Sequence, residues 1–447
     1  MSGKTGIAIV GGGLAGAEAA WQLARRGLEV HLYEQRPQQG TPAHRTGGLA
    51  ELVCSNSLKS TEIENAHGLL KAELQILGAK LPELALQARV PAGSALAVDR
   101  DRFSQLVEQE LAGLPSFHLH REQVKTLAPL LELHKLVILS SGPLTEGALA
   151  NDLAQRTGSE GLYFYDAIAP VVEAESLDKT KVFAASRWGK GEADYLNCPL
   201  TAAEYHLFVE ALLIAEKVPF KDFEQAQHFE GCLPIEVMAA RGPETLAFGP
   251  FKPVGLERGG NRFHAVVQLR QENQSGSLYN LVGCQTRMTF KEQKRVFRLL
   301  PGLEQAEFAR LGSMHRNSFL NAPKLLAADL SLKQEPRLLV AGQLTGVEGY
   351  VESMAAGLWA ALQAWARLQG LAAPLPERTY MLGGLLRHLQ EASPDHYQPM
   401  NANFGLLQGA TRAKRQSKEE YRKAQAAAAL AALQAQPWLA QWRNGTA

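Results

Sequence analysis

Three glycines near the start of the chain have a spacing that suits phosphate binding. Gly11, Gly13 and Gly16 follow a short apolar run and precede a helical stretch. In this arrangement the first glycine makes a tight turn, the second lets backbone approach a pyrophosphate, and the third lets the helix pack closely on the strand. The phosphate then meets free N–H groups at the helix N-terminus. The predicted phosphate-binding residues are Gly11, Gly12, Gly13, Leu14, Ala15 and Gly16.

A carboxylate follows at the distance where a ribose is expected. Glu34 ends the second predicted strand, residues 30–33, and lies 21 residues beyond Gly13. Such a carboxylate accepts hydrogen bonds from ribose hydroxyls and disfavours a 2′-phosphate. Because the strand, the glycines, the helix, the second strand and the acid occur in register, the sequence predicts a dinucleotide site for FAD or NAD rather than NADP.

Four cysteines are the candidate nucleophiles, and they lie far apart in the sequence. Cys54, Cys198, Cys232 and Cys284 are separated by 144, 34 and 52 residues. These separations exclude a zinc knuckle, an adjacent CxxC redox pair and a disulfide scaffold. Any thiol chemistry must therefore come from cysteines that the fold brings together, although a lone cysteine in a globular protein is usually buried and inert.

Two later strand-and-glycine units are expected to complete the nucleotide-binding domain. Residues 136–143 and 338–342 each form an apolar strand that ends in small residues, and a helix to about residue 367 follows the second unit. Flavoproteins with two dinucleotide-binding folds close over the flavin with such a late unit, whose helix N-terminus stabilises negative charge on the reduced ring. An ordinary βα unit is the alternative interpretation. The cofactor-binding candidates here are Gly142, Gly342, Gly346 and Tyr350, the last expected to pack by the flavin.

The segment between these units has a different character. From residue 164 to about residue 329 the regular alternation of helices and strands gives way to mixed segments that are more strand-like. One helix is clear, over residues 201–217, and its start carries a capping box of Thr201 and Glu204. The sequence therefore predicts an α/β fold with a discontinuous, Rossmann-like FAD-binding domain. Its two parts are residues 1–163 and 330–447, and a mixed α+β domain is inserted at 164–329.

Composition supports a folded protein and argues against a membrane protein. Hydrophobic residues make up 46% and charged residues 20% of 447 residues, which excludes a disordered or fibrous chain. No apolar run approaches the ~20 residues of a membrane span, and the first residues lack the apolar core of a signal peptide. We therefore expect a cytoplasmic protein without a membrane partner.

The formal net charge of +1 conceals a basic C-terminal segment. Residues 378–447 hold nine Lys and Arg against four Asp and Glu, a net charge of +5, so the rest of the chain sums to −4. A charge run of this kind is commonly a solvated helix face, but it also suits a phosphate backbone. The candidate tRNA-binding residues are Arg412, Lys414, Arg415, Lys418, Arg422 and Lys423.

Several particular stretches, taken together, resemble one family. They are residues 41–44, 50–58, 89–93, 194–199, 249–256, 314–317, 321–323, 346–350 and 381–385. With them the chain resembles, from Gly11 to about Gly405, the bacterial folate- and FAD-dependent tRNA (uracil-5-)-methyltransferases. Two departures occur: Ser140-Ser141-Gly142 stands where relatives usually have Ala-Thr-Gly, and a glycine precedes Cys232 where alanine is common.

The resemblance implies a reaction, its cofactors and its partners. The family makes 5-methyluridine in the T-loop of tRNA and takes the carbon from 5,10-methylenetetrahydrofolate. NADH or NADPH reduces FAD, and the reduced FAD carries the methylene and supplies reducing equivalents. The implied partners are tRNA and folate, and we expect no obligatory protein partner.

The resemblance also implies roles for two cysteines. A thiolate that adds at C6 of uracil makes C5 nucleophilic, and a base must later remove the C5 proton. We expect Cys232 to attack C6 and Cys54 to assist proton removal, although the two roles can be exchanged. One cysteine in each predicted domain puts the active site between the domains. Since reactive thiolates need positive charge nearby, the candidates for that charge are Lys59, Arg89 and Arg241.

Three neighbouring residues are candidates for contacts with folate or uracil. His315, Arg316 and Asn317 lie in one of the matching stretches, where the first two could bind the folate or position the uracil. An ordinary core histidine and a surface arginine are the structural alternative for the first two.

Three other functions remain open from the sequence. The related FAD- and folate-dependent enzyme that builds carboxymethylaminomethyl groups on wobble uridine is substantially longer. A plain flavin disulfide oxidoreductase usually keeps its redox cysteines adjacent. A non-catalytic, tRNA-binding flavoprotein would keep its tRNA affinity when Cys54 and Cys232 are replaced.

Overall fold

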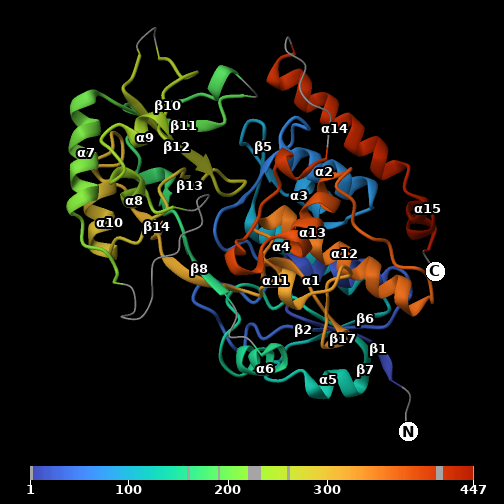
Figure 1. Ribbon diagram of the computed structural model, residues 1–447. Coiled ribbons are helices and arrows are strands. Elements are labelled where there is room, and N and C mark those ends of the chain that lie inside the picture. The colour runs from blue at the N-terminus through green and yellow to red at the C-terminus, as the bar shows by residue number, and fades with distance from the viewer. Residues whose placement is uncertain are drawn as a thin grey trace.

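The computed structural model describes residues 4–158, 162–189, 192–219, 233–258, 262–408 and 416–445. Two six-stranded sheets dominate the described chain, one largely parallel and one antiparallel. Figure 1 shows the parallel sheet at the lower right, the antiparallel sheet with its helices at the upper left, and helix α14 along the right-hand side. The predicted α/β fold is confirmed.

The parallel sheet is built from both ends of the chain. Its strand order is β16-β17-β7-β1-β2-β6, and only the β16–β17 pair is antiparallel. The strands are β1 (Thr5–Val10), β2 (Val30–Tyr33), β6 (Phe117–His120), β7 (His134–Leu139), β16 (Ser331–Leu332) and β17 (Glu335–Val340). Because β17 pairs with β7 about 200 residues earlier in the chain, the late unit joins the same sheet as the glycine motif.

Two helices pack against each other beside this sheet at unusually short range. Helix α1 (Leu14–Ala24) follows the glycine turn and helix α12 (Tyr350–Leu368) follows β17. A Cβ atom at Gly357 would lie 2.1 Å from the carbonyl oxygen of Ala15, so only glycine permits this crossing. The crossing brings the N-terminus of α12 close to the glycine turn.

The antiparallel sheet has a hydrophobic core of its own. Its order is β10-β11-β12-β13-β9-β14. The strands are β9 (Val171–Glu173), β10 (Phe183–Ala184), β11 (Tyr195–Leu200), β12 (Ala265–Gln271), β13 (Leu278–Leu281) and β14 (Phe308–Arg310). The helices of this part are α7 (Ala202–Ile214), α8 (Ile235–Ala239), α9 (Thr245–Phe248) and α10 (Phe290–Phe297). Large buried rings, including Phe208, Phe251 and Phe297, fill the space between sheet and helices.

Helix α7 tests one local prediction in detail. The Thr201 hydroxyl accepts the Glu204 N–H, and the Glu204 carboxylate accepts the Thr201 N–H, which confirms the predicted capping box. The helix ends at Ile214, not at residue 217, because Ala215 adopts φ −58° and ψ 139°.

The remaining elements cover the parallel sheet or connect the two sheets. The short strands β3 (Ser57–Ser60), β4 (Arg89–Val90) and β5 (Ala95–Val98) form a small sheet, and β8 (Leu162–Ala167) pairs with β15 (Met314–Phe319). The other helices are α2 (Ala66–Ile76), α3 (Leu81–Gln87), α4 (Arg100–Ala112), α5 (Ala128–Leu133), α6 (Gly147–Thr157), α11 (Ala322–Leu325), α13 (Met381–Glu391), α14 (Lys418–Gln434) and α15 (Pro437–Asn444).

Polar contacts join the small sheet to the antiparallel sheet. The Asn56 side chain donates to the carbonyl of Gln271, and its amide oxygen accepts from Arg270 Nε. The Tyr195 hydroxyl donates to the carbonyl of Ala92. The core of the antiparallel sheet runs from Val172 to Ala306, whereas Phe319 and Leu326 already belong to the core of the parallel sheet. The domain limits near residues 163 and 329 stay a prediction. Among the described residues no helix has both the length and the hydropathy needed to span a bilayer.

Candidate functional site

A cavity of about 340 Å³ lies where the carboxyl ends of β1, β7 and β17 come together. Its size falls within the range of small-molecule sites, and ligands of parallel α/β sheets bind at this edge. The first sheet contributes the turns after the three strands. The region 164–329 contributes Asp166, Ile168, Gln285, His315 and Asn317 to the lining. Both predicted domains therefore meet at one cavity.

The three glycines of the motif have different surroundings. Gly11 has φ +102°, and a Cβ atom there would lie 2.5 Å from the Ser140 carbonyl oxygen. A Cβ atom at Gly16 would lie 1.9 Å from the Gly11 carbonyl oxygen. Beside Gly13, by contrast, no described heavy atom lies within 4 Å of the Cβ position, and Gly13 lines the cavity. The open space beside Gly13 fits a close-lying phosphate group.

Of the other predicted cofactor residues, some line the cavity and one, Gly346, lies outside its described lining. Leu14, Ala15, Gly142 and Gly342 line the cavity, and no described heavy atom lies within 4 Å of a Cβ placed on Gly142. Gly346 lies outside the described lining, where its φ of +90° places it against the Tyr397 side chain.

Glu34 lines the cavity but is already engaged by the protein. One carboxylate oxygen accepts the Gly12 N–H at 2.8 Å, and the Arg36 backbone and guanidinium occupy further lone pairs. Arg36 also donates to Glu51, so the carboxylate belongs to a buried ion-pair network. The Arg36 guanidinium and the two N–H donors hold the pKa of Glu34 below its usual range despite the opposing effect of burial. The structure thus shows Glu34 bracing the glycine turn, and its contact with a ribose stays a prediction.

Cys54 lies in the cavity wall on a loop that distant residues hold in place. The hydroxyl of Tyr350 accepts the N–H groups of Cys54 at 2.8 Å and of Ser55 at 3.1 Å. The Arg310 guanidinium donates to the carbonyls of Val53 and Cys54, both at 3.1 Å. Tyr350 lines the cavity as expected for a residue near a cofactor, but its hydroxyl contacts the cysteine loop, which the sequence did not indicate.

The electrostatics around Cys54 keep its thiol protonated. Burial raises its pKa, and the Asp166 carboxylate raises it further, whereas Arg100 and Arg310 act in the opposite direction. Of the three cations suggested by the sequence, Lys59 lines the cavity. Arg89 and Arg241 are exposed and lie outside the described lining. The charges that act on this thiol therefore come mainly from residues that the sequence did not single out.

The other cysteines differ in what the structure shows. Cys232 lies outside the described residues. Cys198 and Cys284 are fully buried in the core of the antiparallel sheet, and burial raises the pKa of both thiols. These two have the surroundings of inert core cysteines.

Strand alternation separates the three candidates for folate or uracil contacts. In the β8–β15 ladder His315 pairs with Asp166, and both line the cavity with Asn317. Arg316 lies between His315 and Asn317, so its side chain points to the opposite face. There its guanidinium lies 4.1 Å from the ring centre of Tyr163. The structure therefore brings two of the three predicted residues to the cavity.

One cavity residue with perturbed acid–base behaviour, Glu348, was not predicted from the sequence. Glu348 accepts a hydrogen bond from Gln343 Nε2 at 2.8 Å, and burial with the nearby Asp166 carboxylate raises its pKa to about 8. Burial also lowers the pKa of His315. Near neutral pH the cavity thus holds a protonated Glu348 and a neutral His315. The only sequence signal for Glu348 was its place between Gly346 and Tyr350.

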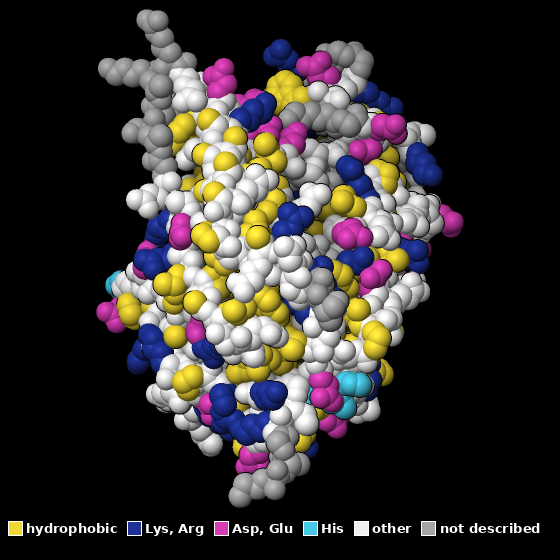
Figure 2. All heavy atoms as spheres, turned by 90° about the vertical axis from the view of Figure 1, so that its right-hand side faces the viewer, with side chains coloured by type: hydrophobic (Ala, Val, Ile, Leu, Met, Phe, Trp, Pro, Cys, Tyr) yellow, Lys and Arg dark blue, Asp and Glu magenta, His cyan; other side chains and the backbone are white. Residues whose placement is uncertain are grey.

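The C-terminal candidates for tRNA binding are only partly described. Arg412, Lys414 and Arg415 lie outside the described residues. Lys418 begins α14 and is exposed, the Arg422 guanidinium lies 5.4 Å from the Phe404 ring centre, and Lys423 pairs with Glu419 and Glu64. Figure 2 shows the face that carries α14 and α15, where Lys and Arg side chains are interspersed with Asp and Glu.

Comparison with known proteins identifies relatives over nearly the whole chain. The family model of glucose inhibited division protein A matches residues 6–372. The methylenetetrahydrofolate–tRNA-(uracil-5-)-methyltransferase TrmFO of Pelotomaculum thermopropionicum is 54% identical over 424 residues, which are 94% of this chain and 96% of that protein. The enzyme of the same name from Geobacter sulfurreducens is 55% identical over 404 residues, 90% of this chain and 92% of that one.

A solved structure shows a similar fold at much lower identity. The form I crystal structure of Aquifex aeolicus GidA matches with a TM-score of 0.70 and 16% identity, over 96% of this chain and 75% of that chain. This likeness supports the parallel sheet with an inserted second sheet as one shared architecture.

Proposed function

The chain belongs to the glucose inhibited division protein A family and groups there with the methylenetetrahydrofolate–tRNA-(uracil-5-)-methyltransferases, and we propose that it methylates C5 of the T-loop uridine of tRNA. The carbon donor is 5,10-methylenetetrahydrofolate and the product is 5-methyluridine. One observation carries the proposal: the Cys54 loop and the glycine turn line the same cavity. A thiol beside a dinucleotide cradle is the pairing that this reaction needs.

The cavity fits FAD at its parallel-sheet side. The open space beside Gly13 and Gly142 would accept the pyrophosphate, next to the N-terminus of α1. The N-terminus of α12, which begins at Tyr350, faces the same cavity. When bound, FAD supplies the redox chemistry and the one-carbon transfer. We also propose that NADH or NADPH reduces the bound FAD. The support for this step is the fit of the cavity residues to a flavin.

The protonation state of the Cys54 thiol supports the roles that we propose for the two cysteines. A thiol held protonated by burial and by Asp166 is a poor nucleophile, because the thiolate is the attacking species. For Cys54 to act as the base, its proton must first pass to a neighbouring group, for which the Asp166 carboxylate in the cavity wall is the candidate, and the thiolate left behind is then a strong base. We therefore assign the attack on C6 to Cys232 and the removal of the C5 proton to Cys54. His315 and Asn317 lie on the β15 wall of the cavity, where they would orient the uracil or the folate.

We assign tRNA binding to the basic segment around the start of α14. The exposed Lys418 lies at the end of the segment that holds Arg412, Lys414 and Arg415. Charge reversal at Lys414, Arg415 and Lys418 should weaken tRNA binding and flatten its salt dependence by roughly 0.9 per lost phosphate contact. An unchanged affinity and an unchanged slope would return the segment to a solvated helix face.

A nucleoside assay tests the reaction. Unmodified tRNA is incubated with the flavin-containing protein, 5,10-methylenetetrahydrofolate and NADPH or NADH, and the digested nucleosides are identified. We expect 5-methyluridine from the wild type, and none from Cys54→Ala or Cys232→Ala. Cys198→Ala is the control, because that thiol lies in the remote core. No 5-methyluridine from flavin-loaded wild type would refute the proposal, and undiminished product from the Cys54 and Cys232 variants would refute the assigned roles.

A further inference from the structure

Two histidines and a glutamate meet in the antiparallel-sheet region. His206 lies on α7, Glu244 immediately precedes α9, and His264 immediately precedes β12. The two oxygens of Glu244 lie 3.1 Å from His206 Nε2 and 3.0 Å from His264 Nε2. One ligand atom from each residue lies within 4.8 Å of the other two. None of the three belongs to the described lining of the cavity that holds the glycine turn and Cys54.

The hydrogen bonding of His206 determines which tautomer its neutral imidazole adopts. His206 Nδ1 lies 2.7 Å from the carbonyl oxygen of Ala202, which can only accept a hydrogen bond. Nδ1 therefore carries the proton, and in the neutral imidazole Nε2 presents its lone pair to the Glu244 carboxylate. A second proton on Nε2 makes this contact an ion pair, and a metal cation between the two groups satisfies the same lone pair and carboxylate. Metal-binding histidines show the same pattern, with the second nitrogen donating to a carbonyl or carboxylate.

Buried hydrogen bonds fix the segments that carry the three side chains. The hydroxyl of the fully buried Tyr205 donates to the carbonyl of Pro243 at 2.7 Å and accepts the N–H of Ala247 at 3.2 Å. These bonds tie both sides of Glu244 to α7. The backbone N–H of His264 donates to the carbonyl of Leu200 at 3.0 Å, just before α7 begins. The three side chains are thus positioned by one rigid corner of the fold.

We propose that His206, Glu244 and His264 bind a divalent cation of the zinc class. Two imidazoles and one carboxylate match the donor set of Zn²⁺ sites with three protein ligands, and Co²⁺ and Ni²⁺ accept the same donors. The side chains are 48%, 38% and 30% exposed, respectively, so a cation reaches them from solvent. The remaining coordination positions are left to water or to an external ligand.

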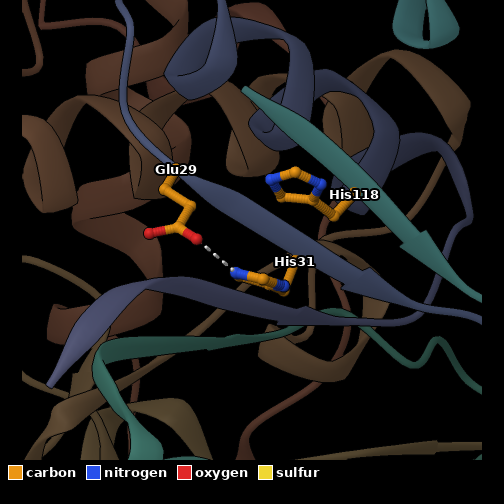
Figure 3. Close-up of side chains that lie close together, drawn as sticks. All are labelled: Glu29, His31 and His118. Carbon is orange, nitrogen blue, oxygen red and sulfur yellow. Dashed lines mark hydrogen bonds and ion pairs between the residues drawn. The ribbon is translucent and has the colours of Figure 1, made fainter. Parts of the chain in front are cut away.

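A second cluster provides an internal comparison. Glu29, His31 and His118 also lie close together, on the parallel sheet, as Figure 3 shows. There His31 Nε2 faces Glu29 at 3.2 Å and His31 Nδ1 faces His120 Nε2 at 3.0 Å. A proton on Nε2 satisfies the carboxylate, and His120 can donate to Nδ1, so this chain of hydrogen bonds needs no cation. It is a surface cluster of the same composition in which neutral imidazoles already satisfy these contacts.

Metal titration of the flavin-containing full-length protein tests the proposal. After treatment with a chelator, Co²⁺ binding is followed by visible absorption, and Zn²⁺ competes in calorimetry. We expect one equivalent with nitrogen and oxygen ligands and without sulfur-to-cobalt charge transfer, which separates this site from the cysteines. His206→Ala and Glu244→Gln should weaken binding by at least ~10-fold, since even the loss of a ligand's hydrogen-bond partner costs about 10- to 100-fold.

The control variant is His31→Ala with His118→Ala, which should retain wild-type affinity. Flavin absorbance and circular dichroism verify the fold of each variant, and because the ligands are partly exposed we expect all of them to fold. Tyr205→Phe should weaken binding without removing a ligand. Equal affinity in wild type, His206→Ala and Glu244→Gln, or loss of binding only in the control, overturns the proposal, as does a wild type that binds no Co²⁺ or Zn²⁺.

Discussion

Two halves of the molecule build the cavity with different parts of the chain. The parallel half holds the parallel sheet, and the antiparallel half comprises the described residues from 162 to 329, with the antiparallel sheet and the separate β8–β15 pair. The parallel half contributes the turns at Gly11, Gly142 and Gly342 and also the side chains of Cys54 and Glu348. The region between contributes side chains, with Asp166, His315 and Asn317 on or facing one ladder. We conclude that the parallel half supplies the glycine cradle, the Cys54 thiol and the Glu348 acid, and that the antiparallel half adds a polar wall whose Asp166 carboxylate acts on both groups. Changes in the cradle should affect ligand binding, and changes in the polar wall should affect acid–base behaviour.

The largest expected effect comes from adding one methyl group to the cradle. Gly13→Ala is compatible with the local backbone, which has φ −73°, and a Cβ atom there meets no described heavy atom within 4 Å. The methyl group projects into the space expected for the pyrophosphate. We therefore expect a folded protein whose FAD affinity is at least ~10-fold lower, equivalent to about 1.4 kcal/mol. The measurement is flavin binding by absorbance titration of the apoprotein.

A second glycine outside the cavity is the matched control. Gly113 ends α4 with φ −73°, and a Cβ atom there makes only ordinary contacts from 3.6 Å outward. Gly113→Ala should bind FAD as the wild type does. If Gly13→Ala retains full FAD affinity, the parallel half does not provide the cradle and the comparison between the halves fails.

An intermediate effect is expected at the contact between Tyr350 and the Cys54 loop, which are far apart in the sequence. Tyr350→Phe removes the oxygen that accepts the N–H groups of Cys54 and Ser55. Two N–H groups lose their acceptor, and the thiol shifts from its position. Since misplacement by about 1 Å can cost 100-fold, we expect kcat to fall by ~10- to 100-fold with unchanged flavin content. Single-turnover formation of 5-methyluridine measures the effect.

Tyr397→Phe controls for the loss of a buried hydroxyl. The Tyr397 hydroxyl donates to the carbonyl of Thr345 at 2.7 Å, and the residue lies outside the described lining of the cavity. This variant should lose stability without a comparable change in kcat. A similar fall of kcat in both variants would assign the effect of Tyr350 to general destabilisation.

Separation along the chain, in both halves, determines what the sequence could predict. The glycine turn, the late βα unit and the capping box at Thr201 are encoded by residues close together in the chain, and local patterns revealed them. The contact of Tyr350 with Cys54 joins residues 296 positions apart, and no local pattern encodes it.

The antiparallel half shows the same limit within one short stretch. His315 and Asn317 face the cavity while Arg316 faces away, and this follows from strand alternation once β15 is known to be a strand. All three were predicted as contacts because they are adjacent in the sequence, and the two-residue alternation of a strand was not applied to them. Arg100 and Arg310 were missed as the cations that act on Cys54, since they come from distant segments.

The smallest expected effect concerns the pH dependence of stability. The raised pKa of Glu348, about 8 against an ordinary value of 4.5, means that the folded protein binds more protons than the unfolded chain between these values. The stabilisation from protonated Glu348 is fully present below about pH 4.5, and it is lost as the pH rises through about 8. This contribution makes the free energy of unfolding fall across that window.

Asp166→Asn tests whether the antiparallel half controls this acid. Removing the Asp166 charge lowers the pKa of Glu348, because that carboxylate opposes the ionisation of Glu348. The variant should lose less stability than the wild type between about pH 5 and about pH 8 in urea unfolding. Asp101→Asn, at an exposed position on α4, should keep the wild-type dependence. If Asp166→Asn also keeps it, the side chains of the second half do not set the acid–base state of the cavity.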